Sequence, residues 1–299
     1  MTKTIRVGCA SGFWGDSYIA APQLIERGNI DYLVFDYLSE ITMSIMARAM
    51  AKDPNAGYAI DFVSVTMASI ARDVAAKKIK VIANAGGVNP RACAAALEAL
   101  LAKLGVDLKV AWIEGDDLMP GLDRWRAAGL TEMFTGMALP EKLVSMNAYL
   151  GGFPVAAALA AGADIVVTGR CVDSAVTLGA CIHEFGWTPS DYDRLAGASL
   201  AAHIVECGAQ ACGGIFTDWQ SVRGWDDIGY AIAEIAPDGS FVATKPEGTG
   251  GLVTPGTVGE QMLYEIGDPQ AYMLPDVVCD FSGVTLTQAG KDRVLVKGA

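Results

Sequence analysis

Short apolar runs alternate with longer segments of helical periodicity over the first two thirds of the chain. Mostly apolar runs occur at 5–9, 32–35, 80–83, 109–113 and 163–168. Apolar strands separated by helices are typical of a parallel sheet covered on both faces. We therefore predict an α/β fold, with a Rossmann-like, doubly wound, mostly parallel sheet. The first helix is expected to begin near Asp16 or Ser17.

The local signals agree best in the segment 80–104. An apolar strand at 80–83 is followed by a glycine-containing turn and then by an apolar stripe at helical spacing. Asn89 suits the position before the helix, Pro90 suits its first turn, and Gly105 suits its C-terminal stop. This segment is predicted to be a strand, a tight turn and a helix that ends at Leu104.

The pattern changes beyond Gly213. Runs at 230–235 and 241–244 flank a Pro-Asp-Gly turn and predict a β-hairpin, followed by a loop at 245–256 and a short helix at 257–266. We predict a Rossmann-like core over 1–215 and a smaller mixed α/β extension over 216–299 that packs on it. The run 294–296 resembles a strand with nothing after it, so the core is expected to continue beyond Ala299.

Composition narrows the class of protein. Hydrophobic residues make up 52% of the 299 positions, and 22 Lys and Arg against 34 Asp and Glu give a net charge of −12. Nucleic acid and anionic membrane are poor partners for such a surface. The apolar stretches are too short to span a bilayer, and the N-terminus lacks the apolar region of a signal peptide. Seven scattered Cys indicate reduced thiols, and we expect a cytoplasmic protein.

Polar residues follow the predicted parallel strands, and their loops should meet at the carboxyl edge of the sheet. The candidates at this edge are Asp16, Asp36, Glu40, Asn84, Asp116, Asp117, Arg170 and Asp173.

Catalytic roles are expected for five of the charged residues. Asp116 or Asp117 would be a general base, with one facing the pocket and the other capping the next segment. Arg170 beside Asp173 would hold a carboxylate or thioester oxygen, and Glu40 is a further candidate. A structural ion pair and a helix cap are the plainer interpretations. Magnesium bound by Asp16, Asp116 and Asp117 is the alternative chemistry.

Glycine-rich turns offer candidate anion sites. Gly12 and Gly15 lie beside Asp16 in a spacing that differs from the dinucleotide motif, and the signal is weak. Gly86 and Gly87, next to Asn84, precede a helix and would receive phosphate or carboxylate, although a tight turn explains them equally well. A third loop places Lys245, Glu247 and Thr249 among glycines. His183 and His203 lack the spacing of a zinc motif and are read as structural.

Several long strings resemble the acyclic terpene utilisation family across essentially the whole chain. They are GFWGDS at 12–17, DYLVFDYLSE at 31–40 followed by TMSI, NAGGVNPRAC at 84–93, GDDL at 115–118, TGRCVDSA at 168–175, ECGAQACGG at 206–214 and KPEGTGGLVTPGTVGEQMLYEIGDP at 245–269. The resemblance implies a bacterial cytosolic protein of catabolism, linked to branched terpenoid acids as CoA thioesters. It also implies a small ferredoxin-like partner, separate or fused, and a core that continues past the last residue. It implies no settled reaction.

We therefore expect a lyase or hydratase that acts on a branched acyl-CoA or carboxylic acid by carboxylate acid/base chemistry. CoA enters only as part of the substrate, and no redox cofactor is indicated. A magnesium-assisted enzyme is one alternative, and a non-catalytic scaffold for the ferredoxin-like partner is another. A homo-oligomer is expected.

Overall fold

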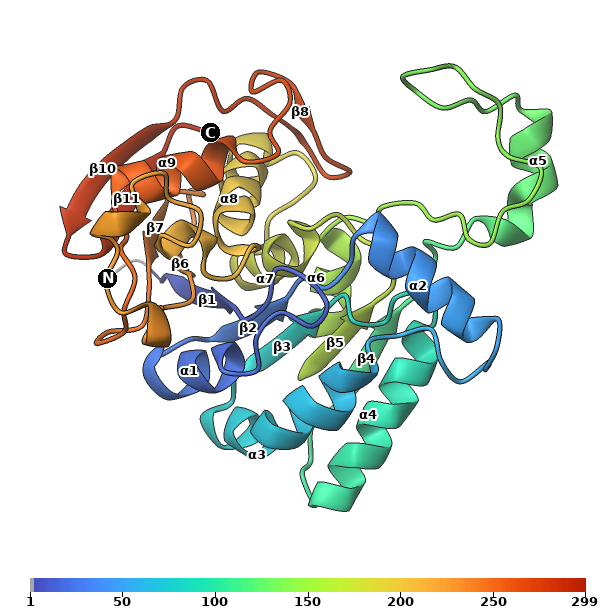
Figure 1. Cartoon of the computed structure of the whole chain (residues 1–299), viewed down its shortest axis with the longest axis horizontal. Coiled ribbons are helices and arrows are strands. Elements are labelled where there is room, and N and C mark those ends of the chain that lie inside the picture. Colours follow the sequence, from blue (N-terminus) through green and yellow to red (C-terminus); the bar gives the residue numbers. More distant parts are fainter. Residues whose placement is uncertain (1–2) are drawn as a thin grey trace.

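The computed structural model describes residues 3–299, and a single large sheet runs through them. Its nine strands follow the order β10-β11-β7-β6-β1-β2-β3-β5-β4 (Figure 1). The parallel strands are β1 (Ile5–Cys9), β2 (Tyr32–Phe35), β3 (Lys80–Ala83), β4 (Val110–Ile113) and β5 (Ile165–Thr168). The antiparallel strands are β6 (Ile232–Ile235), β7 (Phe241–Thr244), β10 (Thr285–Gly290) and β11 (Arg293–Lys297). A separate pair joins β8 (Tyr272–Met273) to β9 (Val278–Cys279).

Helices cover both faces of the parallel strands. The first face carries α1 (Ala20–Arg27), α2 (Glu40–Met50), the π-helical turn η1 (Phe62–Met67), α3 (Ala68–Lys77) and α4 (Pro90–Leu104). The second face carries α6 (Phe153–Ala160) and α7 (Ala175–Phe185), while α8 (Tyr192–Val205) packs on β6 and β7 and α9 (Pro255–Leu263) packs on β10. Short helices complete the chain: η2 (Met119–Gly121), α5 (Leu122–Ala127), η3 (Gln210–Cys212), η4 (Trp219–Ser221) and η5 (Trp225–Asp227).

The parallel strands are apolar on both sides because they separate two cores. In β2, Tyr32 and Val34 belong to one apolar core, whereas Leu33 and Phe35 belong to the other. Successive side chains of a strand point to opposite faces, so both alternating sets must be apolar when both faces are covered. The predicted class, an α/β protein with a large mostly parallel sheet and a hairpin, is confirmed. The parallel part has the order β1-β2-β3-β5-β4, whereas dinucleotide-binding sheets place their strands 3-2-1-4-5-6.

The segment predicted best is the one from β3 to α4. The Asn89 side chain accepts a hydrogen bond from the Ala92 N–H (3.3 Å), and Gly105 ends the helix in the left-handed conformation with φ of 65°. The predicted start of the first helix at 16–17 is wrong, because α1 begins at Ala20. The Asp16 carboxylate instead accepts the Gly12 N–H at 3.0 Å, which closes a loop before the helix.

The C-terminal strands extend the main sheet. The predicted hairpin forms as β6 and β7, and β6 pairs antiparallel with β1. The run 294–296 lies in β11, which has β10 on one side and β7 on the other. This run is therefore not an unpaired strand. Among the helices of residues 3–299, none combines the length and the apolarity that a bilayer crossing requires.

Candidate functional site

Four loops at the carboxyl ends of the parallel strands are joined by hydrogen bonds. The Asn84 amide, after β3, donates to the Asp36 carboxylate, after β2. The Arg170 guanidinium, after β5, donates to the Leu38 carbonyl at 2.7 Å, and its backbone N–H donates to Asp116, after β4, at 2.9 Å. The expected convergence of these loops is therefore present.

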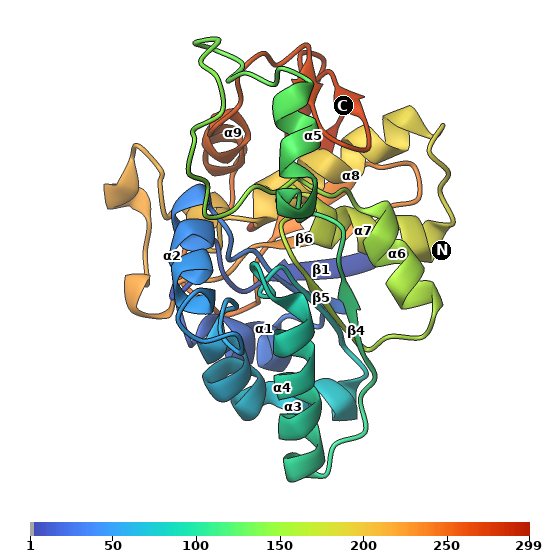
Figure 2. The ribbon, with the colours of Figure 1, turned by 90° about the vertical axis from the view of Figure 1, so that its right-hand side faces the viewer.

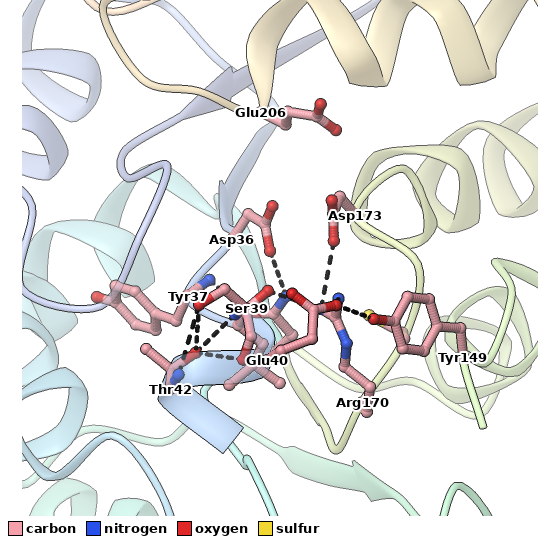
Figure 3. A network of polar contacts seen from close by, with 12 residues as sticks. Asp36, Tyr37, Ser39, Glu40, Thr42, Tyr149, Arg170, Asp173 and Glu206 are labelled. Atoms are coloured by element: carbon pink, nitrogen blue, oxygen red, sulfur yellow. Dashed lines mark hydrogen bonds and ion pairs between the residues drawn. The ribbon is translucent and has the colours of Figure 1, made fainter. Parts of the chain in front are cut away.

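A cluster of three carboxylates lies at the centre of this edge. Asp36 follows β2, Asp173 follows β5, and Glu206 follows the last turn of α8. One carboxylate oxygen from each lies within 4.8 Å of the others, and Figure 3 shows the three side chains facing a common space. They line a cavity of about 410 Å³. The other walls of this cavity include Gly12, Phe13, Asp16, Leu38, Cys207, Gln210, Tyr230, Tyr264 and Glu265.

Burial and mutual repulsion disfavour full ionisation of the cluster. Burial, together with the charges of Asp173 and Glu206, raises the pKa of Asp36 well above its usual range. Burial and then Glu206 raise the pKa of Asp173 to about 7, although Arg170 opposes them. Carboxyl groups this close share protons near neutral pH. Asp36 and Asp173 are therefore more readily protonated near neutral pH than a solvent-exposed aspartate.

Arg170 lies on one side of the cluster, and its Nη1 atom donates to the Leu38 carbonyl and to Asp173. It pairs with Asp173 at 3.3 Å and approaches Glu40 at 3.7 Å. Its guanidinium lies 4.0 Å from the centre of the Tyr149 ring, and the Tyr149 hydroxyl donates to Glu40 (Figure 3). Arg170 thus lies beside two acidic groups, and both of its side-chain hydrogen bonds are made by Nη1.

Glu206 is oriented from the opposite side by a histidine. Nδ1 of His203 lies 2.7 Å from the Glu206 carboxylate, and both side chains are buried. Burial acts to lower the pKa of His203, but the charge and hydrogen bond of Glu206 outweigh it and the pKa is raised. Gln261 of α9 donates to the His203 carbonyl at 3.0 Å, which fixes the end of α8.

Asp116 and Asp117 point in different directions, although β4 ends at Ile113 and the strand does not continue through them. Asp116 is buried and accepts hydrogen bonds from the Arg170 backbone N–H (2.9 Å) and the Asn147 amide (2.8 Å). Burial raises the pKa of Asp116. Asp117 is exposed and accepts the Met119 N–H at 2.9 Å. Both line a second cavity, of about 560 Å³, rather than the one formed by the three clustered carboxylates.

The structure does not bring Asp16, Asp116 and Asp117 together as a magnesium site. Asp16 lines the 410 Å³ cavity and is held by the Gly12 N–H, while the other two acids line the second cavity. Within residues 3–299, the group of acidic side chains close enough to share an ion is the Asp36, Asp173 and Glu206 cluster. Gly15, with φ of 89°, lies at the turn before Asp16.

The backbone groups of Gly86 and Gly87 are not free to receive an anion. The Gly86 N–H donates to the Thr168 carbonyl at 3.0 Å, and the Gly87 N–H lies 3.4 Å from the Asn84 carbonyl. A Cβ on Gly87 would overlap the Met46 sulfur. These glycines allow a tight turn under a methionine, which is the structural interpretation of the motif.

Lys245, Glu247 and Thr249 lie apart from the carboxylate cluster. Nζ of Lys245 donates to the Thr249 carbonyl at 2.8 Å and lies 3.4 Å from Asp292. The loop lines a different cavity, of about 640 Å³, near the end of α1. Glu247 is exposed. The contacts of this loop are local, and its predicted role in substrate binding has no support from them.

Sequence reasoning placed Asp36 at the site edge without a role and overlooked Glu206. The signal for Asp36 was its position directly after a buried strand. Glu206 follows a helix on the other face of the sheet and lies 170 positions from Asp36, so no local motif connects the two.

The fold and the cluster define an α/β protein with three acidic side chains gathered beside a cavity at the carboxyl edge of its parallel strands. The model of the family described as "Acyclic terpene utilisation family protein AtuA" matches residues 5–299. The chain therefore belongs to this family of acyclic terpene utilisation, as the sequence indicated. No curated protein and no solved structure gave a significant match to the chain.

Proposed function

We propose that the protein is a lyase or hydratase that acts on a branched acyl-CoA or carboxylic acid intermediate of acyclic terpene breakdown. The observation that carries the proposal is the cluster of Asp36, Asp173 and Glu206 at the wall of a cavity. Hydration and dehydration need one group that gives a proton and one that takes a proton. Carboxyl groups with displaced pKa values supply both.

The reaction balances without a redox cofactor. In the hydration of an unsaturated thioester, a carboxylate takes a proton from water as the water oxygen bonds to the β carbon. A carboxylic acid gives its proton to the α carbon as the double bond is lost. The cluster ends with as many protons as it began, and dehydration is the reverse. Asp173 is the proton donor, because its pKa is about 7, and Glu206, oriented by His203, is the base.

The cavity suits the acyl part of such a substrate. Its volume of about 410 Å³ lies in the range of small-molecule sites. Phe13, Leu38, Tyr230 and Tyr264 give it apolar wall area beside the acids. A branched acyl chain would fill this space, with the CoA nucleotide outside it.

Turnover of branched unsaturated and hydroxylated acyl-CoA thioesters by the purified full chain tests the proposal. The readout is the ultraviolet absorbance of the conjugated thioester. Asp173→Asn and Glu206→Gln are each expected to lower kcat by about 10²- to 10⁴-fold, the range for a lost general acid or base. Glu247→Gln, an exposed acid outside the cluster, is the control. Inactivity of the wild type toward every thioester, or full kcat in both cluster variants, would refute the proposal.

A magnesium-assisted reaction is the second candidate, and the close approach of three carboxylates favours it. Carboxylate oxygens are the ligands that Mg²⁺ prefers, and an ion would neutralise the repulsion that protons otherwise relieve. The ligands would be Asp36, Asp173 and Glu206. Calorimetric titration of wild type and Asp36→Asn with MgCl₂ tests this, together with turnover in EDTA. Activity that survives EDTA, with no heat of Mg²⁺ binding, leaves the proton-sharing reaction.

A further inference from the structure

Residues 118–146 form an extended arm, and the two ends of this segment are joined to each other where it meets the rest of the molecule. The Leu118 N–H donates to the Met146 carbonyl at 2.8 Å, and Asp117 pairs with Asn147 in an antiparallel bridge. The arm carries α5 and projects away from the sheet in Figure 1, and Figure 2 looks onto it from its own side. None of residues 117–149, all of which the structure describes, is buried. The arm therefore has no core of its own.

The tip of the arm, residues 130–137, exposes large apolar side chains. Phe134 is 85% exposed and Met133 is 77% exposed, and Leu130 and Met137 are exposed beside them. A bridge between Thr131 and Ala138 folds these residues into one turn. Soluble monomers rarely present such a concentrated apolar patch to water, and such patches mark interaction surfaces.

Helix α2 presents a second apolar surface next to the root of the arm. Ile41 is 73% exposed and Ile45 is also exposed, and they lie one turn apart on the same face of the helix. Tyr149, just beyond the arm, donates its hydroxyl to Glu40, the first residue of α2. The root of the arm and the Ile41 face are therefore neighbours in one molecule.

We propose that the arm tip of one copy of this chain packs on the Ile41–Ile45 face of α2 in a second copy, and that the exchange is reciprocal. A two-fold axis beside the root of the arm brings each tip to the other copy's α2, so one symmetric contact covers both apolar surfaces.

Both uncovered apolar surfaces belong to this one chain, and their local charge does not oppose contact between two copies. The chain carries −12 overall, which opposes contact between most parts of its surface. The arm is neutral, with three acids and three bases, and α2 is neutral, with Glu40 and Arg48. The proposed contact thus joins two apolar, uncharged surfaces of an acidic protein.

Sedimentation of the full chain over a range of concentrations tests the proposal. The wild type is expected to be a dimer. Phe134→Asp and Ile41→Asp should each raise the dimer Kd by about 100-fold or more, because each dimer loses two buried apolar contacts. Leu263→Asp is the matched control, since Leu263 is 68% exposed at the end of α9, outside both surfaces. Circular dichroism checks that each variant is folded.

An equimolar mixture of the two variants tests the pairing itself. Ile41→Asp retains an intact arm and Phe134→Asp retains an intact α2, so the mixture should form a heterodimer with one native contact. Its Kd should be lower than that of either variant alone. A monomeric wild type, an equal effect of Leu263→Asp, or a mixture no tighter than the single variants would overturn the proposal. A monomer whose arm instead binds a small ferredoxin-like protein would overturn it as well.

Discussion

Asp173 should make the protein less stable as the pH rises through neutrality. Burial and Glu206 raise the pKa of Asp173 to about 7, although Arg170 lies only 3.3 Å away. In an unfolded chain an aspartate titrates near ~3.9. Between these two values the folded chain holds a proton that the unfolded chain has lost. The stabilisation is therefore complete below about pH 4 and is lost as the pH rises through about 7.

The size of this stabilisation follows from the shift in the pKa of Asp173 and from the exposure of its side chain. A pKa displaced from ~3.9 to about 7 corresponds to roughly 4 kcal/mol when each pKa unit is worth ~1.36 kcal/mol. The Asp173 side chain is 36% exposed, so solvent screening reduces the effect, and we expect about 2 kcal/mol. Asp36 and Asp173 titrate as an interacting pair, so the loss of stability with pH belongs to both carboxyl groups together.

Denaturant unfolding of the wild type and Asp173→Asn between about pH 5 and about pH 8.5 measures this effect. The wild type should lose about 1.3 kcal/mol of unfolding free energy relative to the variant across this interval, because about a third of the full effect falls between pH ~3.9 and about 5, and most of the loss should occur below pH ~7. Asp117→Asn, an exposed acid at the same sheet edge, should follow the wild type. Parallel curves for wild type and Asp173→Asn would show that attraction to Arg170 cancels the effect of burial. A wild type that gains stability relative to the variant as the pH rises would show that this attraction outweighs burial.

Three further predictions follow from single contacts. Glu206→Gln removes a charge that raises the pKa of Asp173, so the descending limb of kcat against pH should move to lower pH in steady-state assays. Gly87→Ala should lower unfolding free energy by about 3 kcal/mol, because its Cβ would overlap the Gly57 carbonyl oxygen as well as the Met46 sulfur. Gly105→Ala, with open space around it, should cost about 1 kcal/mol, and both are measured by denaturant titration. Asp117→Ala should cost about 1 kcal/mol, seen as a lower Tm, because the Met119 N–H loses its hydrogen bond to the carboxylate, and an unchanged Tm would contradict that role.

The parts of the fold that were predicted correctly depend on local chemistry. Asn89 and Pro90 mark the start of α4 and Gly105 marks its end, and each signal acts on residues next to it in the chain. The structure has the helix at the predicted limits. The start of α1 was missed because Asp16 closes a loop with the Gly12 N–H, a contact that resembles a helix cap in sequence. The pairing of β6 with β1 joins positions more than 200 residues apart, which no local signal contains.

The general position of the site was predicted from the parallel topology of the sheet, but the roles of its residues were not. Parallel topology brings the ends of β2, β4 and β5 to one edge, so Asp36, Asp116 and Asp173 were all expected there. Their roles depend on which backbone groups each acid meets. Asp116 is directed to the Arg170 N–H, whereas Asp173 turns toward the cavity. Hydrogen bonds of this kind connect loops from different strands and are fixed only once the strands are in register.

The three clustered carboxyl groups lower the stability of the fold, and this indicates that they serve the chemistry of the site. Three acids within 4.8 Å repel one another, and burial penalises each charge. Asn or Gln at Asp36 or Glu206 would keep the shape and the hydrogen-bonding capacity while removing the repulsion. Arg170 relieves only part of it, because the pKa of Asp173 is raised despite the ion pair. Buried groups that are held at a cost in stability are concentrated at functional sites, since activity needs the charge or the proton that stability does not. Asp36→Asn should therefore raise the free energy of unfolding near neutral pH and lower turnover in the same variant.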